Sequence, residues 1–324
     1  MRLRVLHQTT YHYQSPVVLG QHIAHLRPTE ATGQTLISHH FHVDPLPAHL
    51  EDSRDAFGNW RTFFALQSSH QSLSVVADSV VDTVPAGPLV HTMTWEAARE
   101  QFRYRAGASY QPASEFVFPS PYVPRDEAFA DEARPIFTPE RPLLEACEAL
   151  MAHLHETLTY ETASTEVNTP ALQALAQRKG VCQDFAHIML GCLRSLGLPA
   201  RYVSGYLLTQ PPEGQPRLVG ADASHAWVSV YADGDWVDFD PTNNRCGAGS
   251  PGEDYVTLTT GRDFGDVSPL RGVIQGGGNH TLEVGVTVAP PGEFPATATA
   301  PATTANAGNA EPATSPENLT KDIP

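Results

Sequence analysis

The sequence has few cysteines and no long hydrophobic segment. Its 324 residues include four cysteines, at positions 147, 182, 192 and 246, and no two of them form a CxxC pair. This excludes a disulfide framework, argues against a redox or zinc protein built on paired cysteines, and fits a reducing compartment. No apolar run approaches the roughly 20 residues that cross a bilayer, and the first residues lack the apolar core of a signal peptide. We therefore expect a soluble, cytoplasmic protein.

Positive charge is also scarce. The chain carries 20 Lys and Arg residues against 36 Asp and Glu residues, a formal net charge of -16. Nucleic acids and anionic membranes attract proteins through clustered positive charge, so we expect neither as a partner. At 324 residues the chain is long enough for two domains, each with its own core. The sequence does not indicate an oligomeric state.

The N-terminal quarter alternates short apolar or aromatic runs with turn residues. Four runs are typical of strands: residues 2–14, 37–45, 60–67 and 72–84. Because Pro, Gly, Asn and Asp separate them, we predict a small antiparallel β-sandwich over residues 1–90. Within it, Asp55–Asn59 (DAFGN) is expected to be a structural loop in which Gly58 permits a tight turn.

Three histidines lie close together in the second of these runs. Alternation along a strand would place His40 and His42 on one face and His39 on the other, which suggests a metal site. The neighbouring sequence supplies no further ligands. We therefore interpret all three as sheet histidines, solvated or half-buried, and expect no metal there.

Residues 91–137 are irregular and rich in proline and aromatic side chains. They are typical of a connector draped over a surface, which could also wall a cleft. A helix is predicted to begin at Thr138, with a buried apolar stripe that includes Cys147. Cys147 is interpreted as a core residue, and so is Cys192 in the next buried helix face. Cys246, in a glycine-rich loop with no base nearby, is interpreted as incidental.

Residues 169–198 form the centre of the candidate catalytic region. They predict one helix capped by Thr169, a sharp turn with Gly180 as the left-handed stop, and a second helix that begins at Cys182 and ends before Pro199. Apolar residues at helical spacing bury one face of the second helix. Unpaired N–H groups and the positive end of the helix dipole favour the thiolate form of Cys182.

A histidine and an aspartate follow on a predicted hairpin. The Asp-Gly pair at 233–234 is a strong two-residue turn signal, so Ala232 faces Asp235 and the numbers of other paired residues also sum to 467. His225 then becomes a diagonal neighbour of Asp240. About 7–8 Å would separate their Cα atoms, which is within hydrogen-bond reach of the two side chains. A one-residue bulge would break this arrangement.

A cysteine at a helix start, a strand histidine and a strand aspartate are the three parts of thiol catalysis. Cys182 would attack a carbonyl carbon, His225 would take and return a proton, and Asp240 would fix the imidazole tautomer. The backbone N–H of Cys182 is the natural first donor to the oxyanion, and the sequence names no second donor. Each residue alone has a structural explanation, as a buried helix residue, a sheet histidine or a strand end. Together they favour catalysis.

Proton transfer should matter more than activation of the thiol. Lowering a thiol pKa by about 2 units raises its reactivity at neutral pH only about threefold, because the thiolate also becomes a weaker nucleophile. Protonating an amine leaving group is worth about 10² to 10⁴. We therefore expect His225 to act chiefly as the proton donor when the substrate is an amide.

The last part of the chain changes character twice. Residues 255–288 predict further strands, at 257–265 and 280–288, with a turn at Gly276–Gly278 before the second. From residue 289 onward Ala, Thr, Pro and Asn replace the large apolar residues. Such a segment cannot bury enough apolar surface to order itself, so we predict a disordered tail.

Three stretches carry a resemblance to a known family: GVCQDFAHIMLGCLRSLGLPARYVSGYL, SHAWVSVY and DFDPTNN. Over residues 143–258 the chain closely resembles the bacterial transglutaminase-like family of papain-like thiol enzymes, and its strand-rich start resembles the N-terminal region that commonly precedes this core. The resemblance implies an α+β fold with four parts. They are an N-terminal β domain (1–90), a connector (91–137), a papain-like transglutaminase core with a central helix packed on an antiparallel sheet (138–288) and the tail (289–324).

The resemblance also implies roles for residues. Cys182, His225 and Asp240 match the family's nucleophile, base and orienting acid, in a family of cross-linking acyltransferases, peptidases and deglycosylating amidases. We expect attack on a peptide or glutamine-type amide through a Cys182 thioester, with hydrolysis favoured over transfer because nothing visible excludes water. The chain lacks the clustered acidic loops of a calcium-dependent enzyme, so we expect no metal and no cofactor. The alternative is a catalytically silent peptide-binding module on the same fold.

Overall fold

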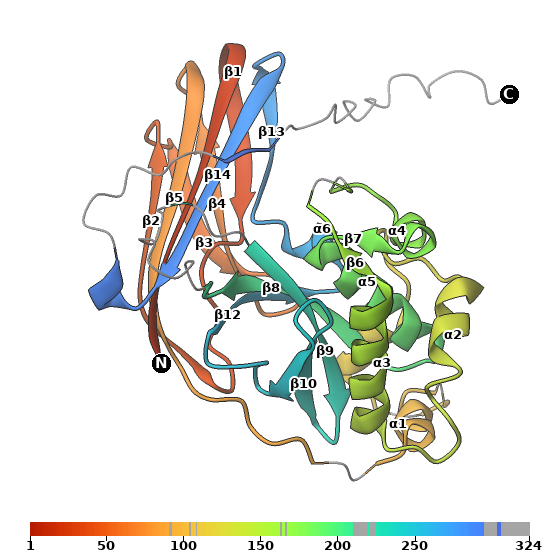
Figure 1. Cartoon of the computed structure of the whole chain (residues 1–324). Helices are drawn as coiled ribbons and strands as arrows, with labels where there is room; N and C mark the ends of the chain where they lie inside the picture. Colours follow the sequence, from red (N-terminus) through yellow and green to blue (C-terminus); the bar gives the residue numbers. More distant parts are fainter. Residues whose placement is uncertain are drawn as a thin grey trace, which may run out of the picture.

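The computed structural model describes residues 1–90, 93–103, 105–107, 109–162, 164–165, 167–209, 220, 224–294 and 303–305. Across these residues the chain forms two large antiparallel sheets, with helices gathered on one side (Figure 1). This arrangement confirms the predicted α+β class. The predicted disordered tail lies, apart from residues 289–294 and 303–305, outside the described residues. Within the described part, no helix has the length and apolar character needed to cross a membrane.

The first sheet has eight strands, which come from both ends of the chain. They are β1 (Arg2–Ala24), β2 (Gln34–Asp44), β3 (His49–Arg54), β4 (Trp60–Leu66), β5 (His70–Thr83), β13 (Leu270–Gly276), β14 (His280–Ala289) and β15 (Thr303–Ala305). The 23-residue β1 pairs with β4, β5, β13 and β14 and so connects the whole sheet. The predicted N-terminal β structure is therefore one curled antiparallel sheet with its own apolar core (Figure 1).

The four predicted strand segments of the N-terminal part are confirmed, but two features of the sheet have no local signal. β3 has the sequence HLEDSR and is almost entirely exposed, so it lacks the apolar alternation that marks a strand. The strand predicted at 257–265 ends at Gly261. β14 is the strand predicted at 280–288, and the turn before it at Gly276–Gly278 has positive φ values throughout, whereas β13 is not among the predicted strands. Their partner is β1, however, and no local pattern predicts a pairing such as Arg4 with Ala289.

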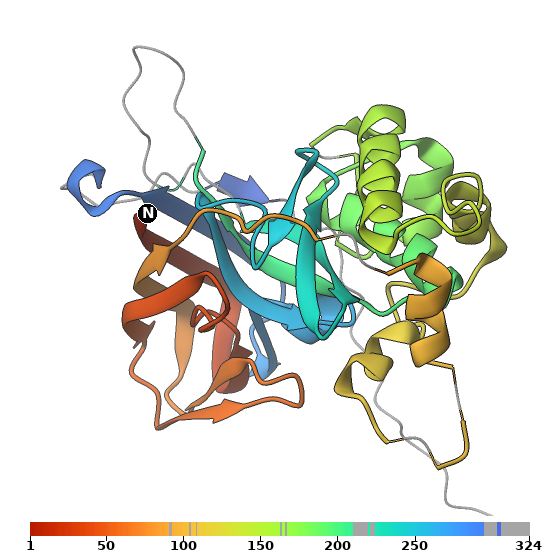
Figure 2. The same cartoon turned by 90° about the horizontal axis from the view of Figure 1, so that it is seen from below.

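The second sheet, called the core sheet here, has the strand order β11-β10-β9-β8-β12. Its strands are β8 (Ala200–Leu207), β9 (Ser224–Ala232), β10 (Asp235–Asp240), β11 (Arg245–Ala248) and β12 (Tyr255–Gly261). The helices are α1 (Trp95–Gln101), η1 (Pro112–Val117), α2 (Glu127–Ala133), α3 (Leu143–Thr157), α4 (Ala171–Gln177), α5 (Cys182–Ser195), α6 (Phe264–Val267) and η2 (Pro291–Glu293). Two short strands, β6 (Thr159–Tyr160) and β7 (Lys179–Gly180), pair in parallel. The core sheet lies between the helices and the first sheet (Figures 1 and 2).

The predicted hairpin register is confirmed. β9 and β10 pair without a bulge from Asp235 and Ala232 to Phe239 and Val228. The turn residues at 233 and 234 have φ values of 51° and 93°, as the Asp-Gly signal requires. Val228 and Phe239 are fully buried against the helices, so the opposite face of the hairpin presents its polar and aromatic side chains.

Three local predictions need correction. α3 begins at Leu143 rather than Thr138, because Glu140 takes a left-handed φ of 63° and Pro142 occupies the N-cap position. Cys246 lies on β11 rather than in a loop. The connector is less irregular than predicted, since it contains α1, η1 and α2. η1 also lines a cavity of about 730 Å³ beside the turn end of the hairpin, so the connector does wall a cleft.

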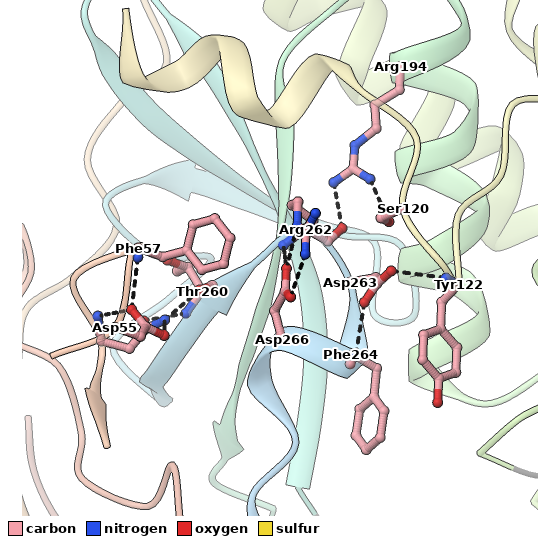
Figure 3. A network of polar contacts seen from close by, with 12 residues as sticks. Asp55, Phe57, Ser120, Tyr122, Arg194, Thr260, Arg262, Asp263, Phe264 and Asp266 are labelled. Atoms are coloured by element: carbon pink, nitrogen blue, oxygen red, sulfur yellow. Dashed lines mark hydrogen bonds and ion pairs between the residues drawn. The ribbon is translucent and has the colours of Figure 1, made fainter. Parts of the chain in front are cut away.

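Two side-chain amides of the first sheet bind the free edge of β12. The Gln34 amide donates to the Thr257 carbonyl at 2.8 Å and accepts from the Thr257 N–H at 2.7 Å. The Asn59 amide makes the same exchange with Thr260, at 2.7 and 2.8 Å. The Asp55 carboxylate orients Asn59 by accepting from its side chain and backbone N–H groups, close to Thr260 (Figure 3). These bonds take the place of a neighbouring strand and protect the edge of the core sheet.

This contact explains the DAFGN segment as a structural loop. Gly58 has a φ of 85°, which confirms the predicted tight turn, and the turn brings Asn59 onto β12. The far end of α5 is fixed nearby by the buried Arg194, which donates to the Ser120 hydroxyl at 3.2 Å and to the Arg262 carbonyl at 2.5 Å (Figure 3). Burial lowers the pKa of Arg194 to about 10, so it stays charged at neutral pH. The helix that begins with Cys182 is thus anchored at its other end.

Candidate active site

Cys182 begins α5 in a turn built around Asp184. The Asp184 carboxylate accepts hydrogen bonds from the Val181 N–H at 2.8 Å and from the Thr165 hydroxyl at 2.6 Å. A β-carbon at Gly180 would lie 2.6 Å from that carboxylate, so a larger residue there would displace it. The carboxylate therefore fixes the backbone turn that presents the thiol.

This turn differs from the predicted one in two respects. The left-handed residue after α4 is Arg178, with a φ of 53°, whereas Gly180 lies in the short strand β7. α4 has Pro170 as its N-cap residue and no side-chain cap hydrogen bond, so the prediction that Thr169 caps this helix is wrong. The predicted helix start at Cys182 is confirmed.

Cys182 differs from the other three cysteines in its surroundings. Cys147 and Cys192 are fully buried, and burial raises their pKa values far above the ordinary range. Burial and the neighbouring Glu148 raise the pKa of Cys246 to about 11. These three thiols stay protonated at neutral pH, and the first two are core residues, as predicted. Cys182 is only partly buried and faces a histidine.

The structure brings Cys182, His225 and Asp240 together at one end of the core sheet. Nε2 of His225 lies 2.7 Å from Oδ2 of Asp240, which confirms the diagonal contact expected from the hairpin register. Cys182 lies close enough to the same ring to raise its pKa. Because Nε2 faces Asp240, Nδ1 is the nitrogen left for the thiol.

Charged partners outweigh burial at His225. Burial opposes the protonated ring, but the hydrogen bonds with Asp240 and Cys182 and the charges of both raise its pKa to about 10. Burial likewise opposes the Asp240 carboxylate, yet hydrogen bonds from His225, Asn243 and Tyr255 lower its pKa. At neutral pH His225 is therefore an imidazolium beside an ionised Asp240. Such a ring can donate a proton to a leaving amine.

Two residues outside the predicted site, Asn243 and Tyr255, hold Asp240. Its Oδ2 accepts from the Asn243 side chain and the Tyr255 hydroxyl, each at 2.7 Å, in addition to His225. Its Oδ1 accepts from the backbone N–H groups of Thr242 and Asn243, at 2.9 and 3.3 Å. The turn residues after Asp240 could have indicated Asn243, because an aspartate often accepts from the backbone two residues on. Tyr255 gives no local signal, because its contact depends on how distant strands are placed.

A second buried carboxylate lies two residues earlier on β10. Oδ2 of Asp238 accepts from the Trp227 indole N–H at 3.0 Å, and burial raises the pKa of Asp238. The indole N–H is thus already engaged. Among the described residues, the Cys182 backbone N–H remains the one group that we assign to an oxyanion.

The histidines of β2 are half-buried (His39) or exposed (His40 and His42), as expected of sheet residues. Nδ1 of His39 lies 2.8 Å from the Ser79 hydroxyl, and burial lowers the pKa of this histidine to about 4. Across the residues that the structure describes, no group of three or more His, Cys, Asp or Glu side chains is placed to hold a metal ion. The expectation that the protein needs no metal stays a prediction.

Two family models match the chain. Residues 3–82 match the bacterial transglutaminase-like N-terminal region, and residues 130–241 match the transglutaminase-like superfamily. The chain belongs to the transglutaminase-like superfamily. The match over residues 130–241 includes Cys182, His225 and Asp240. The match over residues 3–82 includes most of strands β1 to β5. Membership in this superfamily suggests an enzyme.

Some similar proteins align with most of this transglutaminase-like chain, and others align with only part of it. An uncharacterized protein of Mycobacterium tuberculosis is 37% identical over 300 residues, 89% of this chain and 93% of that protein. A protein-glutamine gamma-glutamyltransferase of Pseudomonas aeruginosa is 33% identical over 128 residues, 37% of this chain and 18% of that enzyme. The crystal structure of a proposed cysteine protease from Cytophaga hutchinsonii has a TM-score of 0.67 at 22% identity, covering 90% of this chain and 91% of that one. The last similarity supports the fold.

Proposed function

We propose that this protein is a thiol enzyme that attacks an amide of a protein or peptide through a thioester on Cys182. The proposal depends above all on the hydrogen bond between His225 and Asp240, which holds the ring as an imidazolium beside Cys182. Cys182 lies at a helix start, where unpaired backbone N–H groups stabilise negative charge. The superfamily to which the chain belongs is consistent with this chemistry.

The reaction has two halves. The Cys182 sulfur adds to the amide carbonyl carbon, and the Cys182 backbone N–H donates to the oxyanion. His225 then gives its proton to the amine nitrogen as the C–N bond breaks, which leaves a thioester. In the second half, neutral His225 takes a proton from water as the water oxygen attacks, and the C–S bond breaks to release the acid. Asp240 stays ionised and holds the Nε2–H of the ring throughout.

The acyl donor that we propose is a peptide bond or a glutamine-type carboxamide. The similarity of the core to a protein-glutamine gamma-glutamyltransferase supports the carboxamide. Water is the favoured acceptor, because Cys182 is only partly buried and solvent can reach it. The steps above require no metal or cofactor. We also propose a cytoplasmic location, where its four free cysteines would stay reduced.

Trapping the acyl-enzyme tests this proposal. Wild-type protein is incubated with cell extract, with and without an added primary amine, and Cys182 is examined by mass spectrometry. We expect an acyl adduct on Cys182 whose product is the acid even when the amine is present. The Cys192→Ala variant should form the same adduct, because Cys192 is a buried core residue. If the product is an amide of the added amine, the reaction is acyl transfer and the proposed hydrolysis is wrong. If Cys182 never carries an adduct, the whole proposal is contradicted.

The silent peptide-binding module differs in the reactivity of its thiol. At about pH 6 an ordinary thiol reacts slowly with iodoacetamide, whereas a thiolate paired with an imidazolium reacts fast. We expect stoichiometric labelling of Cys182 in the native protein and slow labelling after unfolding in urea. Equal rates in both states would favour the silent module.

A further inference from the structure

Tyr255 places a hydroxyl inside the candidate site from a strand that carries none of the three proposed catalytic residues. It is the first residue of β12, the edge strand of the core sheet. Its side chain is 1% exposed, and its oxygen lies 2.7 Å from Oδ2 of Asp240. The rings of Tyr255 and His225 lie 6.0 Å apart between centroids. The two rings are therefore in contact, and the Tyr255 hydroxyl acts on the histidine through the carboxylate.

The direction of this hydrogen bond is fixed by chemistry. An ionised carboxylate only accepts, and burial together with the charge of Asp240 raises the pKa of Tyr255, so the phenol keeps its proton and donates. Oδ2 of Asp240 thus receives three donors, from His225, Asn243 and Tyr255. Donors that share one oxygen also share its negative charge. The Tyr255 bond therefore weakens the attraction between Asp240 and the proton on His225.

The Tyr255 ring is held by groups other than the proposed catalytic residues. The Trp227 ring packs edge-on against it at 5.4 Å, and the Arg245 guanidinium carbon lies 4.8 Å from its centroid. Arg245 is itself fixed by Asp254 through two hydrogen bonds of 2.6 and 2.7 Å. Farther along β12, the Gln34 amide anchors the strand to the first sheet. The hydroxyl thus has a fixed position from which it can orient the carboxylate.

We propose that Tyr255 is a positioning residue: its hydroxyl holds the Asp240 carboxylate in place and limits how tightly that carboxylate binds the His225 proton. This inference rests on the proposed function. Among the described residues, the other titratable groups that act on Tyr255 or His225 are Cys182 on α5, Arg245 on β11 and Asp254. A tyrosine-to-phenylalanine change leaves all three in place, so it isolates the effect of the hydroxyl.

The Tyr255→Phe variant tests the proposal with two readouts. We expect kcat on an amide to fall roughly tenfold while KM is unchanged, because a hydrogen bond to a charged group is lost without loss of a substrate contact. We also expect the titration of His225, followed by NMR of the histidine ring and assigned with His225→Gln, to move upward by roughly half a pH unit. The alkaline limb of the kcat profile should move in the same direction.

Tyr206→Phe is the matched control. Tyr206 is also 1% exposed, but its hydroxyl lies 2.8 Å from Nδ1 of His7 at the contact with the first sheet. This variant should lose stability and leave both kcat and the His225 titration unchanged. If Tyr255→Phe also changes only stability, the positioning role is overturned. The NMR titration does not depend on turnover, so it tests the role of Tyr255 independently of the proposed function. The proposed function is overturned by a different result, an unreactive Cys182 in the wild-type protein.

Discussion

Each of the two sheets buries a histidine near a tyrosine, and the two rings behave in opposite ways. His7 in the first sheet is 2% exposed, with the hydroxyls of Tyr206 and Thr9 at 2.8 and 3.2 Å from its nitrogens. Burial lowers its pKa to about 4. For His225 in the core sheet, burial acts in the same direction, but Asp240 and Cys182 raise its pKa to about 10.

The difference lies in the charge of the partners. Neutral hydroxyls satisfy the hydrogen bonds of a ring without stabilising its charged form, whereas the carboxylate of Asp240 stabilises it. His7 is therefore a neutral packing residue at neutral pH, and His225 is poised to give up a proton. The comparison shows that burial alone does not mark a functional histidine in this molecule.

The largest expected effect comes from removing the thiol that faces His225. Cys182→Ala should lower amide turnover by at least about 10⁴-fold, because the nucleophile is lost. Cys192→Ala removes a fully buried thiol from the same helix and should leave turnover per folded molecule unchanged. Steady-state kinetics with folded protein quantified by circular dichroism checks both. Comparable losses in the two variants would mean that the helix, and not the Cys182 thiol, is what matters.

Removing the charged ring itself should separate two substrate classes. His225→Ala should lower amide turnover by about 10² to 10⁴, because the leaving amine loses its proton donor. A nitrophenyl ester or thioester needs little protonation of its leaving group, so part of that activity should remain. His7→Ala is the control in the first sheet and should spare both reactions in the folded fraction. An equal loss on amide and ester in His225→Ala would contradict the proton-donor role.

Neutralising the carboxylate should make His225 resemble His7. In Asp240→Asn the main charge partner is lost, so the pKa of His225 should fall and amide turnover should drop by about 10²-fold. Asp238→Asn changes a carboxylate two residues away that is 6% exposed, and burial already raises the pKa of Asp238. Turnover measured against pH should shift its alkaline limb downward in the first variant and not in the second. A similar shift in both would remove the special role of Asp240.

The smallest expected effect is on stability in acid. The pKa of His7 is about 4 in the folded protein and about 6.5 in the unfolded chain. The stability that neutral His7 contributes is therefore fully present above about pH 6.5 and is lost as pH falls toward 4. We expect the titration of His7 to lower the free energy of unfolding by about 2 kcal/mol as the pH falls from 7 to about 4.5. His225 has the opposite sign: its contribution is present below about 6.5 and is lost as pH rises through about 10. Urea unfolding of wild type and His7→Gln at both acidic and neutral pH checks this, and an equal loss in the two proteins would contradict it.

Local sequence signals predict the position of His225 relative to Asp240 and the helix start at Cys182. The turn at 233–234 fixes the hairpin register, and the register alone brings His225 to Asp240. The apolar period of α5 likewise indicates a helix that starts at Cys182. In contrast, the contact of Tyr255 with Asp240 depends on the pairing of β12 with β8, which separates β12 from β9. No pattern in the sequence around Tyr255 predicts this pairing.

The same distinction holds for the fold. Alternating apolar residues predict most strands of the first sheet, but β3 is missed because its exposed residues make no apolar face. The positions where Gln34 and Asn59 bind β12 could not be predicted either, because a side-chain amide that replaces a strand has no periodic pattern. A glycine between two helices predicts a left-handed turn, but Gly180 instead leaves room for the Asp184 carboxylate. For Gln34 and Asn59 the missing information is a contact between segments that lie about 200 residues apart.

One NMR titration of the wild-type protein tests the central claim most directly. With ring resonances assigned through His7→Gln and His225→Gln, we predict that His225 is protonated at neutral pH and titrates near 10, while His7 is neutral and titrates near 4. If both rings lose their protons together near the ordinary value of about 6.5, the charged series of Cys182, His225 and Asp240 does not exist in solution.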